Sequence, residues 1–275
     1  MTEQMKSIKL IVTDLDDTLL RRDKTISDYT VNIFQRVRQR GLLVAFATAR
    51  SLVDSQDYRT MLNPDGDIVT GGCLVFAGKQ LLSSFYIPEP QGATLLSELC
   101  SYPSVKRVSA RSLHARYANI PMEDRLCVDF QSTLPEKLLH CSCRTDDVLL
   151  IKSIAARYPD FLFLQVTGSD LYDINPIGAT KMNGVKTLSE HFHIPLSQIV
   201  AFGDDFNDVG MLSGCGVGVA MNNAIDECKS VADNVCGDCD EDGVAHWIDE
   251  HLQLTKRDCT AMITSLTEKL LERRG

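Results

Sequence analysis

The sequence has no excess of basic residues, no long apolar run and no internal repeat. Its 28 Lys and Arg residues are outnumbered by 37 Asp and Glu residues, which gives a net charge of -9 at pH 7. A chain of this sign gains no electrostatic attraction to nucleic acids or anionic membranes, so we expect neither as a partner. No apolar run approaches the roughly 18 residues of a membrane-spanning helix, and no basic leader precedes the first predicted strand. We therefore expect a cytoplasmic protein.

The sequence also lacks complete zinc-binding sets, although it contains ten cysteines. Cys141 and Cys143 form one close pair and Cys236 and Cys239 another. No second Cys or His pair at ligand spacing accompanies either one, and structural zinc needs four ligands. The chain is also too long for a small disulfide-stapled scaffold. We therefore expect buried thiols rather than metal ligands or disulfides.

Length and composition are those of a globular protein with one large domain or two linked domains. The chain has 275 residues, of which 44% are hydrophobic and 24% are charged. Domains of about 150 residues are the usual guide, and a core of this size folds without staples.

Five short apolar segments predict strands that are buried on both faces. Between the first two, Ser27 is a predicted helix N-cap and Gly41 a predicted helix end, which gives a right-handed strand–helix–strand unit. We therefore predict an α/β fold whose core is a Rossmann-like, doubly wound parallel sheet. The five predicted strands are residues 8–13, 42–47, 67–70, 198–202 and 217–220.

A domain-sized insertion interrupts this pattern. Thr48 and Lys181 are separated by 132 residues, far more than a crossover needs, and residues from about 85 to 176 have strand and helix patterns of their own. We predict a catalytic core of residues 1–85 and 179–275, with an inserted α+β cap at 86–178. Residues 88–90 and 175–178 are the predicted hinges. Beyond Leu254, helical spacing predicts an amphipathic helix that packs on the core in preference to a partner; its apolar positions are Cys259, Met262, Ile263, Leu266 and Leu270.

Polar residues follow the predicted strands of the core. In doubly wound sheets, ligands bind beyond the carboxyl ends of the strands, so these side chains should converge. Two carboxylates about 4 Å apart repel by roughly 4 kcal/mol at an effective dielectric near 20. Several together need a cation, and oxygen ligands favour Mg²⁺. The converging residues are Asp14, Asp16, Thr48, Asp204, Asn207 and Asp208.

Four segments in order carry a specific resemblance. They are DLDDT at 14–18, ATAR at 47–50, PIGATK at 176–181 and GDDFND at 203–208. Together they resemble the four motifs of haloacid dehalogenase superfamily phosphatases, and their spacing resembles the Cof-like subclass with a type IIB cap. The segment DEDGVA at 240–245 is also similar to that subclass.

The resemblance implies a role for each residue of the four motifs. Asp14 would be the nucleophile that forms an aspartyl phosphate, and Asp16 would protonate the leaving group and then activate water. Lys181 would supply positive charge for both catalysis and phosphate binding. Phosphate binding would also use the Thr48 hydroxyl, the Ala49 backbone N–H at a turn that opens a helix, and Asn207. Magnesium would be held by Asp14, the Asp16 main-chain carbonyl, Asp204 and Asp208.

Other charged residues receive a structural or solvated interpretation. Asp17 and Asp205 are predicted to be structural, and Asp54 and Asp57 to be solvated on the helix after the second strand. Five basic residues of the predicted cap could reach a second anionic group of the substrate, although a solvated face is favoured. They are Lys106, Arg107, Arg111, His114 and Arg116.

The sequence therefore predicts a magnesium-dependent phosphatase of small phosphorylated metabolites, with sugar phosphates as the first class to consider. A phosphomutase or phosphotransferase of the same fold is the nearest alternative. A non-catalytic receiver module that is phosphorylated on aspartate is an alternative from another class, and a catalytically inactive binding protein is a third.

Overall fold

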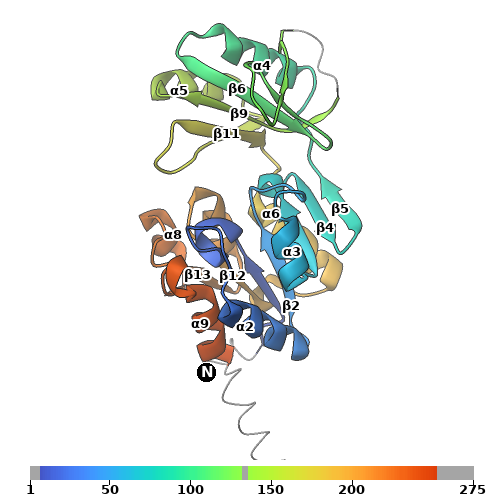
Figure 1. Cartoon of the computed structure of the whole chain (residues 1–275), viewed down its shortest axis with the longest axis vertical. Coiled ribbons are helices and arrows are strands. Elements are labelled where there is room, and N and C mark those ends of the chain that lie inside the picture. Colours follow the sequence, from blue (N-terminus) through green and yellow to red (C-terminus); the bar gives the residue numbers. More distant parts are fainter. Residues whose placement is uncertain (1–6, 132–135, 253–275) are drawn as a thin grey trace, which may run out of the picture.

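The protein consists of two layered bodies, a core and a cap, that are stacked along its long axis (Figure 1). The structure, a computed structural model, describes residues 7–131 and 136–252. Each body has its own sheet, of eight strands in the core and six in the cap. Each also has its own cluster of buried apolar side chains.

The core contains the predicted doubly wound parallel sheet. Its strand order is β14-β13-β12-β1-β2-β3-β4-β5, and the pairs from β14 to β3 are parallel. The central strand β1 has an unbroken buried sequence, as expected for a strand with helices on both faces. The parallel strands are β1 (Leu10–Thr13), β2 (Leu43–Ala47), β3 (Gly66–Val69), β12 (Ile199–Gly203), β13 (Val217–Ala220) and β14 (Asn234–Val235).

Sequence analysis did not predict the antiparallel edge of this sheet. Strands β4 (Leu74–Ala77) and β5 (Gln80–Ser84) form a hairpin that continues the sheet beyond β3. The chain leaves the core at the end of this hairpin.

Helices cover both faces of the core sheet (Figure 1). Helix α2 (Asp28–Gln39) begins after Ser27, whose hydroxyl accepts the Thr30 N–H, and it ends before Gly41, as predicted. It packs with α9 (Gly243–Leu252), whereas α6 (Lys181–Phe192) packs with α7 (Val209–Gly214). The shorter helices are α3 (Gln56–Leu62) and α8 (Asp226–Val231).

The cap is the expected α+β body. Its sheet has the order β10-β11-β9-β6-β7-β8, and α4 (Gln91–Ser101) and α5 (Val148–Arg157) lie on the side away from the core (Figure 1). Alternate residues of β6 and β9 are buried, including Val108, Ala110, Cys141 and Cys143. The residues between them point to the opposite face. The strands are β6 (Val105–Ser112), β7 (Arg116–Ala118), β8 (Leu126–Cys127), β9 (Leu138–Thr145), β10 (Phe161–Gln165) and β11 (Leu171–Pro176).

Two connections join the cap to the core. One runs from β5 to α4 and the other from β11 to α6, and the domain limits proposed from the sequence stay a prediction. A small apolar cluster spans the junction: Leu139 of β9 packs with Leu74 and Ala179. The Cys73 thiol also donates to the Leu139 carbonyl at 3.1 Å. The hinge function of these connections stays a prediction.

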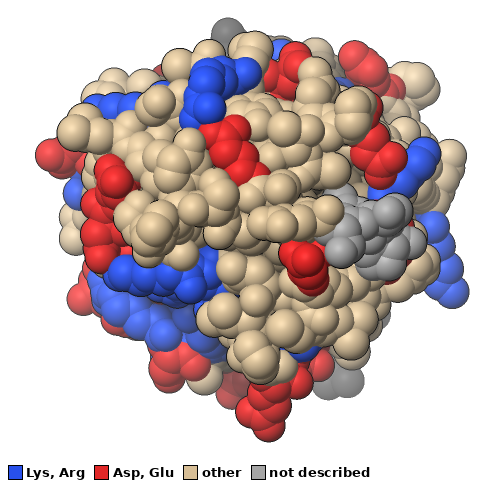
Figure 2. All heavy atoms as spheres, turned by 90° about the horizontal axis from the view of Figure 1, so that it is seen from above, with Lys and Arg blue, Asp and Glu red and all other residues tan. Residues whose placement is uncertain are grey.

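The cap end of the molecule carries charges of both signs. Figure 2 shows Lys and Arg side chains next to Asp and Glu side chains, mostly around the edge of this view. No helix within the described ranges is both long and apolar enough to cross a bilayer. The helix predicted beyond Leu254 lies outside the described residues.

The two close cysteine pairs differ in their surroundings. Cys141 and Cys143 are buried in β9, and burial raises the pKa of the Cys143 thiol to about 12. Cys239 lies between Asp238 and Asp240, and Arg22 donates hydrogen bonds to both carboxylates. A guanidinium group thus already neutralises the acidic groups beside this thiol.

Candidate active site

The first-motif aspartate lies at the carboxyl end of the central strand. Asp14 follows β1, and its N–H donates to the Phe202 carbonyl of β12 at 3.0 Å, which extends the parallel ladder by one residue. Because β12, β1 and β2 are neighbours, the segments that follow them emerge at the same edge of the sheet, facing the cap (Figure 1).

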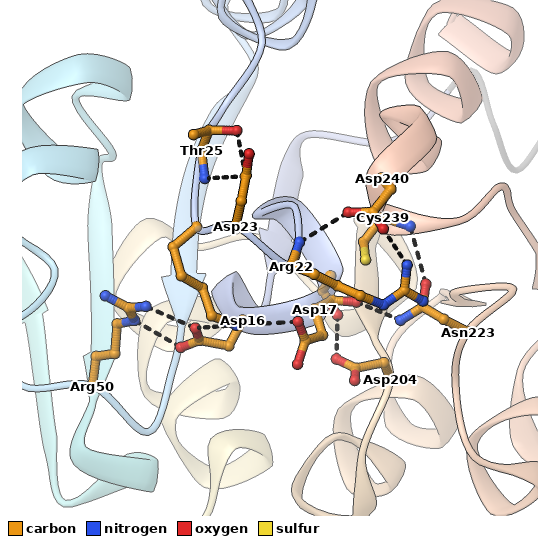
Figure 3. A network of polar contacts seen from close by, with 12 residues as sticks. Asp16, Asp17, Arg22, Asp23, Thr25, Arg50, Asp204, Asn223, Cys239 and Asp240 are labelled. Atoms are coloured by element: carbon orange, nitrogen blue, oxygen red, sulfur yellow. Dashed lines mark hydrogen bonds and ion pairs between the residues drawn. The ribbon is translucent and has the colours of Figure 1, made fainter.

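A single wide turn, Leu15–Leu19, directs the side chains of the first motif apart. It closes with a hydrogen bond from the Leu20 N–H to the Leu15 carbonyl at 2.8 Å, and Asp17 adopts a left-handed φ of 57°. Thr18 is buried and donates to Asp204 Oδ1 at 2.6 Å. Asp16 instead turns toward Arg50, away from Asp204 (Figure 3).

Asp208 is fully buried and organises the turn after β12. Its Oδ2 accepts the N–H groups of Asp204 at 2.9 Å and Asp205 at 3.2 Å. Gly203 makes this possible, because a Cβ there would lie 2.4 Å from Asp208 Cβ. Asp205 caps the same turn, which agrees with its predicted structural role.

Lys181 is the first residue of α6 and is only 1% exposed. The Thr180 hydroxyl caps the helix by accepting the Asn183 N–H at 3.1 Å. Gly72, with φ +105°, allows the turn after β3 to approach this cap closely, since a Cβ there would lie 2.4 Å from the Thr180 carbonyl. Lys181 Nζ thereby reaches Asp14 Oδ1 at 2.8 Å and Asp208 Oδ1 at 2.6 Å.

One buried ammonium group faces three carboxylates. Burial raises the pKa of Asp14 well above its usual range, and Asp208 and Asp204 add to this while Lys181 opposes it. Burial and then the charge of Asp208 raise the pKa of Asp204 to about 7. Burial alone would lower the pKa of Lys181, but its two ion pairs raise it above its ordinary value. One positive charge therefore faces three carboxyl groups, and a further cation would stabilise the cluster.

The same three carboxylates fit a hard divalent cation. Oxygen atoms of Asp14, Asp204 and Asp208 lie within 4.8 Å of one another. All-oxygen ligands are the donor set that Mg²⁺ prefers. The side chain of Asp16 is not in this group, so only its main-chain carbonyl remains as its predicted ligand atom.

The turn after β2 carries Thr48 and Ala49. Thr48 is 1% exposed, its N–H donates to the Ile68 carbonyl, and its hydroxyl oxygen accepts the Arg50 N–H at 3.1 Å. Ala49 is exposed, and none of the residues in the described ranges accepts a hydrogen bond from its N–H. The prediction that this turn opens a helix is wrong, because α3 begins only at Gln56. Residues 52–55 before α3 instead form turns, and Asp54 among them reaches the cap.

Arg50, which sequence analysis did not single out, contacts a predicted catalytic residue. Its Nε and Nη2 donate to the two Asp16 oxygens, both at 2.7 Å (Figure 3). Lys24 Nζ lies 3.1 Å from Asp16 Oδ1. Burial would raise the pKa of Asp16, but Arg50 and Lys24 together lower it below its usual range.

Asn207 lies in the turn between Asp204 and Asp208. Its Oδ1 is buried and has no hydrogen-bond partner within the described part of the chain. A buried amide without a partner is costly, so this atom has a hydrogen bond to gain when a ligand binds.

Asp54 is not solvated, which corrects the prediction made from the sequence. It lies before α3 and accepts hydrogen bonds from the cap residues Arg111, at 3.2 Å, and Arg116. Burial would raise its pKa, but Ser51 and the two arginines lower it. Asp57 is exposed in the first turn of α3, as predicted. Another cap–core hydrogen bond joins the Thr167 hydroxyl to Asp205 Oδ1 at 2.5 Å.

The predicted basic residues of the cap divide into three groups. Lys106 is paired with Asp146 at 2.5 Å and Asp170 at 3.0 Å and does not line the site. Arg107, Arg111 and Arg116 line a cavity of about 190 Å³ that also contains Ala49 and Thr70 of the core. His114 lines a neighbouring cavity of about 710 Å³.

Sequence reasoning missed two further basic residues of the smaller cavity, Arg125 and His140. Strand alternation in the cap could have identified His140, because it pairs with Arg111 and therefore lies on the same face. Arg125 lies outside the strands, between Met122 and β8, where no periodic signal applies.

Comparisons with known proteins agree with this architecture. Residues 11–248 match the haloacid dehalogenase-like hydrolase family. The chain is 27% identical over 270 residues to 5-amino-6-(5-phospho-D-ribitylamino)uracil phosphatase YitU of Bacillus subtilis strain 168, covering 89% of this chain and 98% of the relative. It is also 27% identical over 256 residues to the HMP-PP phosphatase of Klebsiella pneumoniae strain 342, covering 87% and 94%. Among solved structures, the subclass IIB sugar phosphatase BT4131 superposes with a TM-score of 0.76 at 23% identity, covering 90% of this chain and 99% of that one.

Proposed function

This chain belongs to the haloacid dehalogenase-like hydrolase family, and on that premise we propose that it hydrolyses small phosphomonoesters in a magnesium-dependent reaction that passes through an aspartyl phosphate on Asp14. The observation that carries the proposal is the group of Asp14, Asp204 and Asp208 around Lys181, in which Asp204 is half-buried and the others are buried. Structural packing alone does not favour two buried carboxylates and a half-buried one around a single ammonium group, because their desolvation is costly.

In the proposed first step, an Asp14 carboxylate oxygen attacks phosphorus and the ester oxygen leaves. The ion pair with Lys181 at 2.8 Å orients the Asp14 carboxylate and helps to keep it ionised. The phosphoryl oxygens are bound by the Thr48 hydroxyl, the exposed Ala49 N–H and the Asn207 amide. Mg²⁺, held by Asp14, Asp204, Asp208 and the Asp16 main-chain carbonyl, would offset the charge of the phosphate.

Asp16 is the proposed acid and base. It donates a proton to the departing alkoxide and then accepts one from the water that hydrolyses the aspartyl phosphate. Its double hydrogen bond to Arg50 holds it as a carboxylate, which suits the second role but not the first. We infer that Arg50 releases Asp16 when substrate binds.

The relatives support small phosphorylated metabolites as the substrate class. Those named above are phosphatases of a phosphoribitylamino-uracil and of HMP-PP, and the structural neighbour is a sugar phosphatase. Sugar phosphates therefore remain the first class to assay. The cap, which closes the cavity above Ala49, would select among them.

Release of inorganic phosphate from a panel of phosphometabolites, with Mg²⁺ or with a chelator, tests the proposal. We expect turnover only with Mg²⁺, and a phosphorylated Asp14 peptide after rapid quenching and mass analysis. Asp204→Asn should abolish both turnover and the increase in Tm on adding Mg²⁺. The matched control is Asp17→Asn, a neighbouring exposed carboxylate paired with Lys24, which should retain the Tm increase.

The same assay separates the alternatives. A phosphomutase would return the phosphoryl group to another hydroxyl, giving an isomer instead of inorganic phosphate. A receiver module would incorporate at most about one phosphoryl group per chain, and a binding protein would incorporate none. Multiple turnovers that release phosphate would exclude all three.

A further inference from the structure

The face of the cap sheet that looks toward the core is unusually rich in arginine. Arg107 and Arg111 are separated by an even number of positions in β6, so their side chains lie on the same face of the sheet. His140 of β9 pairs with Arg111 and therefore lies on this face as well. Arg116 and Arg125 border the same cavity of about 190 Å³. Among the described residues, Asp173 is the only carboxylate that lines it, and Asp173 Oδ1 is 3.1 Å from His140 Nε2.

The positive charge of this cavity is only partly compensated. Asp54 and Asp124 together contact three of the four arginines: Arg111, Arg116 and Arg125. Arg125 Nε is buried, makes no hydrogen bond within the described ranges and lies 3.4 Å from the nearer Asp124 oxygen. Two carboxylates thus serve three guanidinium groups, and neither forms an ion pair with the fourth, Arg107, within the described ranges.

Arg107 has the least compensation of the four. Among the described residues, the Met122 sulfur, at 3.7 Å, is the only atom to which it donates a hydrogen bond. Burial, followed by the charges of Arg125 and Arg144, lowers its pKa below the ordinary value for arginine. A half-buried guanidinium group beside like charges is unfavourable unless an anion joins it.

The cavity opens onto the proposed phosphate-binding turn. Ala49 and Thr70 of the core line it together with the arginines of the cap. A molecule whose phosphate is bound at Ala49 would therefore extend directly toward Arg107 and Arg125. At about 190 Å³ the cavity is smaller than the roughly 300–1,000 Å³ typical of drug-sized ligands, so it suits a compact group.

We propose that Arg107 and Arg125, with Arg111 and Arg116, bind a second anionic group of the substrate, so that the preferred substrate is a short phosphomonoester with a phosphate or carboxylate at its far end. This proposal rests on the proposed phosphatase function and specifies its substrate. Guanidinium groups suit either anion because their N–H groups match two oxygens at once.

The test compares compounds that share one carbon skeleton. Monophosphates of straight-chain diols with three to six carbons are assayed beside the bisphosphates and the phosphooxy-carboxylates of the same length. The wild-type protein should give a higher kcat/KM for one or both two-anion series. Which series is preferred distinguishes phosphate from carboxylate.

Two variants of adjacent residues identify the site. The quantity to compare is kcat/KM for the two-anion substrate divided by kcat/KM for the one-anion substrate. Arg107→Gln should lower this ratio about 10- to 100-fold, which corresponds to the loss of a charge-assisted hydrogen bond. Lys106→Gln removes the same charge from the next residue of β6, but Lys106 is paired with Asp146 and Asp170 away from the cavity. It should leave the ratio within about twofold of the wild-type value.

Binding measured by calorimetry on Asp14→Asn provides a readout that does not depend on turnover. The two-anion compound should bind more tightly than the one-anion compound, and Arg107→Gln in this background should remove the difference. Equal kcat/KM and equal affinity for the two series, or equal effects of the Arg107 and Lys106 variants, would overturn the proposal. If no compound is hydrolysed, the phosphatase function fails, while the calorimetric comparison still decides whether the arginines bind a second anion.

Discussion

Arg50 holds Asp16 through two parallel hydrogen bonds, from Nε to Oδ2 and from Nη2 to Oδ1, both at 2.7 Å. Arg50 Nη1 also donates to the Asp54 carbonyl at 3.2 Å. The Asp54 side chain in turn accepts hydrogen bonds from Arg111 and Arg116 of the cap. A continuous set of polar contacts therefore connects the cap with the proposed acid–base residue, so the position of the cap can bear on whether Asp16 is free to act.

We expect Asp16→Asn to separate the two proposed steps. The amide retains the main-chain carbonyl but neither donates the proton that an alkoxide needs nor accepts one from water. With a sugar phosphate, kcat should fall roughly 10²- to 10⁴-fold. With p-nitrophenyl phosphate, whose leaving group needs no proton, the first step should be less affected and phosphorylated Asp14 should accumulate, which rapid-quench mass analysis would detect.

Asp17→Asn is the matched control for this variant. Asp17 is the next residue, is paired with exposed Lys24, and has a φ of 57° that asparagine tolerates. It should retain activity on both substrates. Equal losses for the two leaving groups in Asp16→Asn would show that Asp16 is not the general acid.

Replacement of the buried lysine should reduce both stability and activity. Lys181→Met would leave Asp14 and Asp208 buried without their shared cation. Loss of one partner of a buried ion pair typically costs about 3–5 kcal/mol, so urea unfolding without Mg²⁺ should show a decrease of that order. kcat/KM should fall as well. Lys186→Met, on an exposed position of the same helix, is the control, and an equal effect of both variants would contradict the role of Lys181.

The core and its acidic cluster could be predicted because local patterns determine them. The apolar strands 10–13 and 199–203 are short and bounded by Asp14 and Asp204, and parallel pairing necessarily brings their carboxyl ends together. Lys181 was predictable from the resemblance of residues 176–181. Its burial was not, because a lysine after a threonine is equally consistent with an exposed first turn of a helix.

The contacts between cap and core could not be predicted in the same way. Asp54 looked like a solvated helical residue, since sequence does not show that β6 and β7 would place Arg111 and Arg116 above it. The edge hairpin β4–β5 was missed for a related reason: β5 is largely exposed, so it lacks the continuous apolar run of a buried strand. Sequence periodicity reports local structure, so it could not predict contacts between segments that are distant in the sequence.

Asp54→Ala should loosen the cap. The change removes the carboxylate that both cap arginines contact, and partly exposed ion pairs of this kind each contribute up to about 1 kcal/mol. Hydrogen exchange in the segment that joins β6 to β7 should become faster, while exchange in β1 and β12 stays the same. Asp57→Ala, three residues further on and exposed, should change neither. Unaltered exchange near Arg111 in the Asp54 variant would mean that the apolar junction around Leu139 is sufficient to hold the cap.

The pH dependence of stability should reveal the buried carboxyl group of Asp67 in β3. Asp67 is 1% exposed, and its only charged neighbour within the described ranges is Arg59, whose Nη2 lies 3.0 Å from Oδ2. Burial raises the pKa of Asp67, and Arg59 opposes this only in part. The native state therefore retains a proton at pH values where the unfolded chain, with a pKa near 3.9, has already lost it. Because the unfolded state then binds fewer protons, the free energy of unfolding decreases as pH rises from about 3.9 to the native pKa of Asp67.

Asp67→Asn removes this titration while keeping an oxygen close to Arg59 Nη2. The relevant quantity is the free energy of unfolding of Asp67→Asn minus that of the wild-type protein. This difference should increase with pH over the same interval and then become constant. Urea unfolding at a series of pH values measures the difference, in which the titrations shared by both proteins cancel. Arg59→Gln should raise the pKa of Asp67 further and extend the interval, but it should have no such effect in the Asp67→Asn background. A difference that is flat or falls with pH would show that the Asp67 carboxyl group is ionised in the native protein at no net cost.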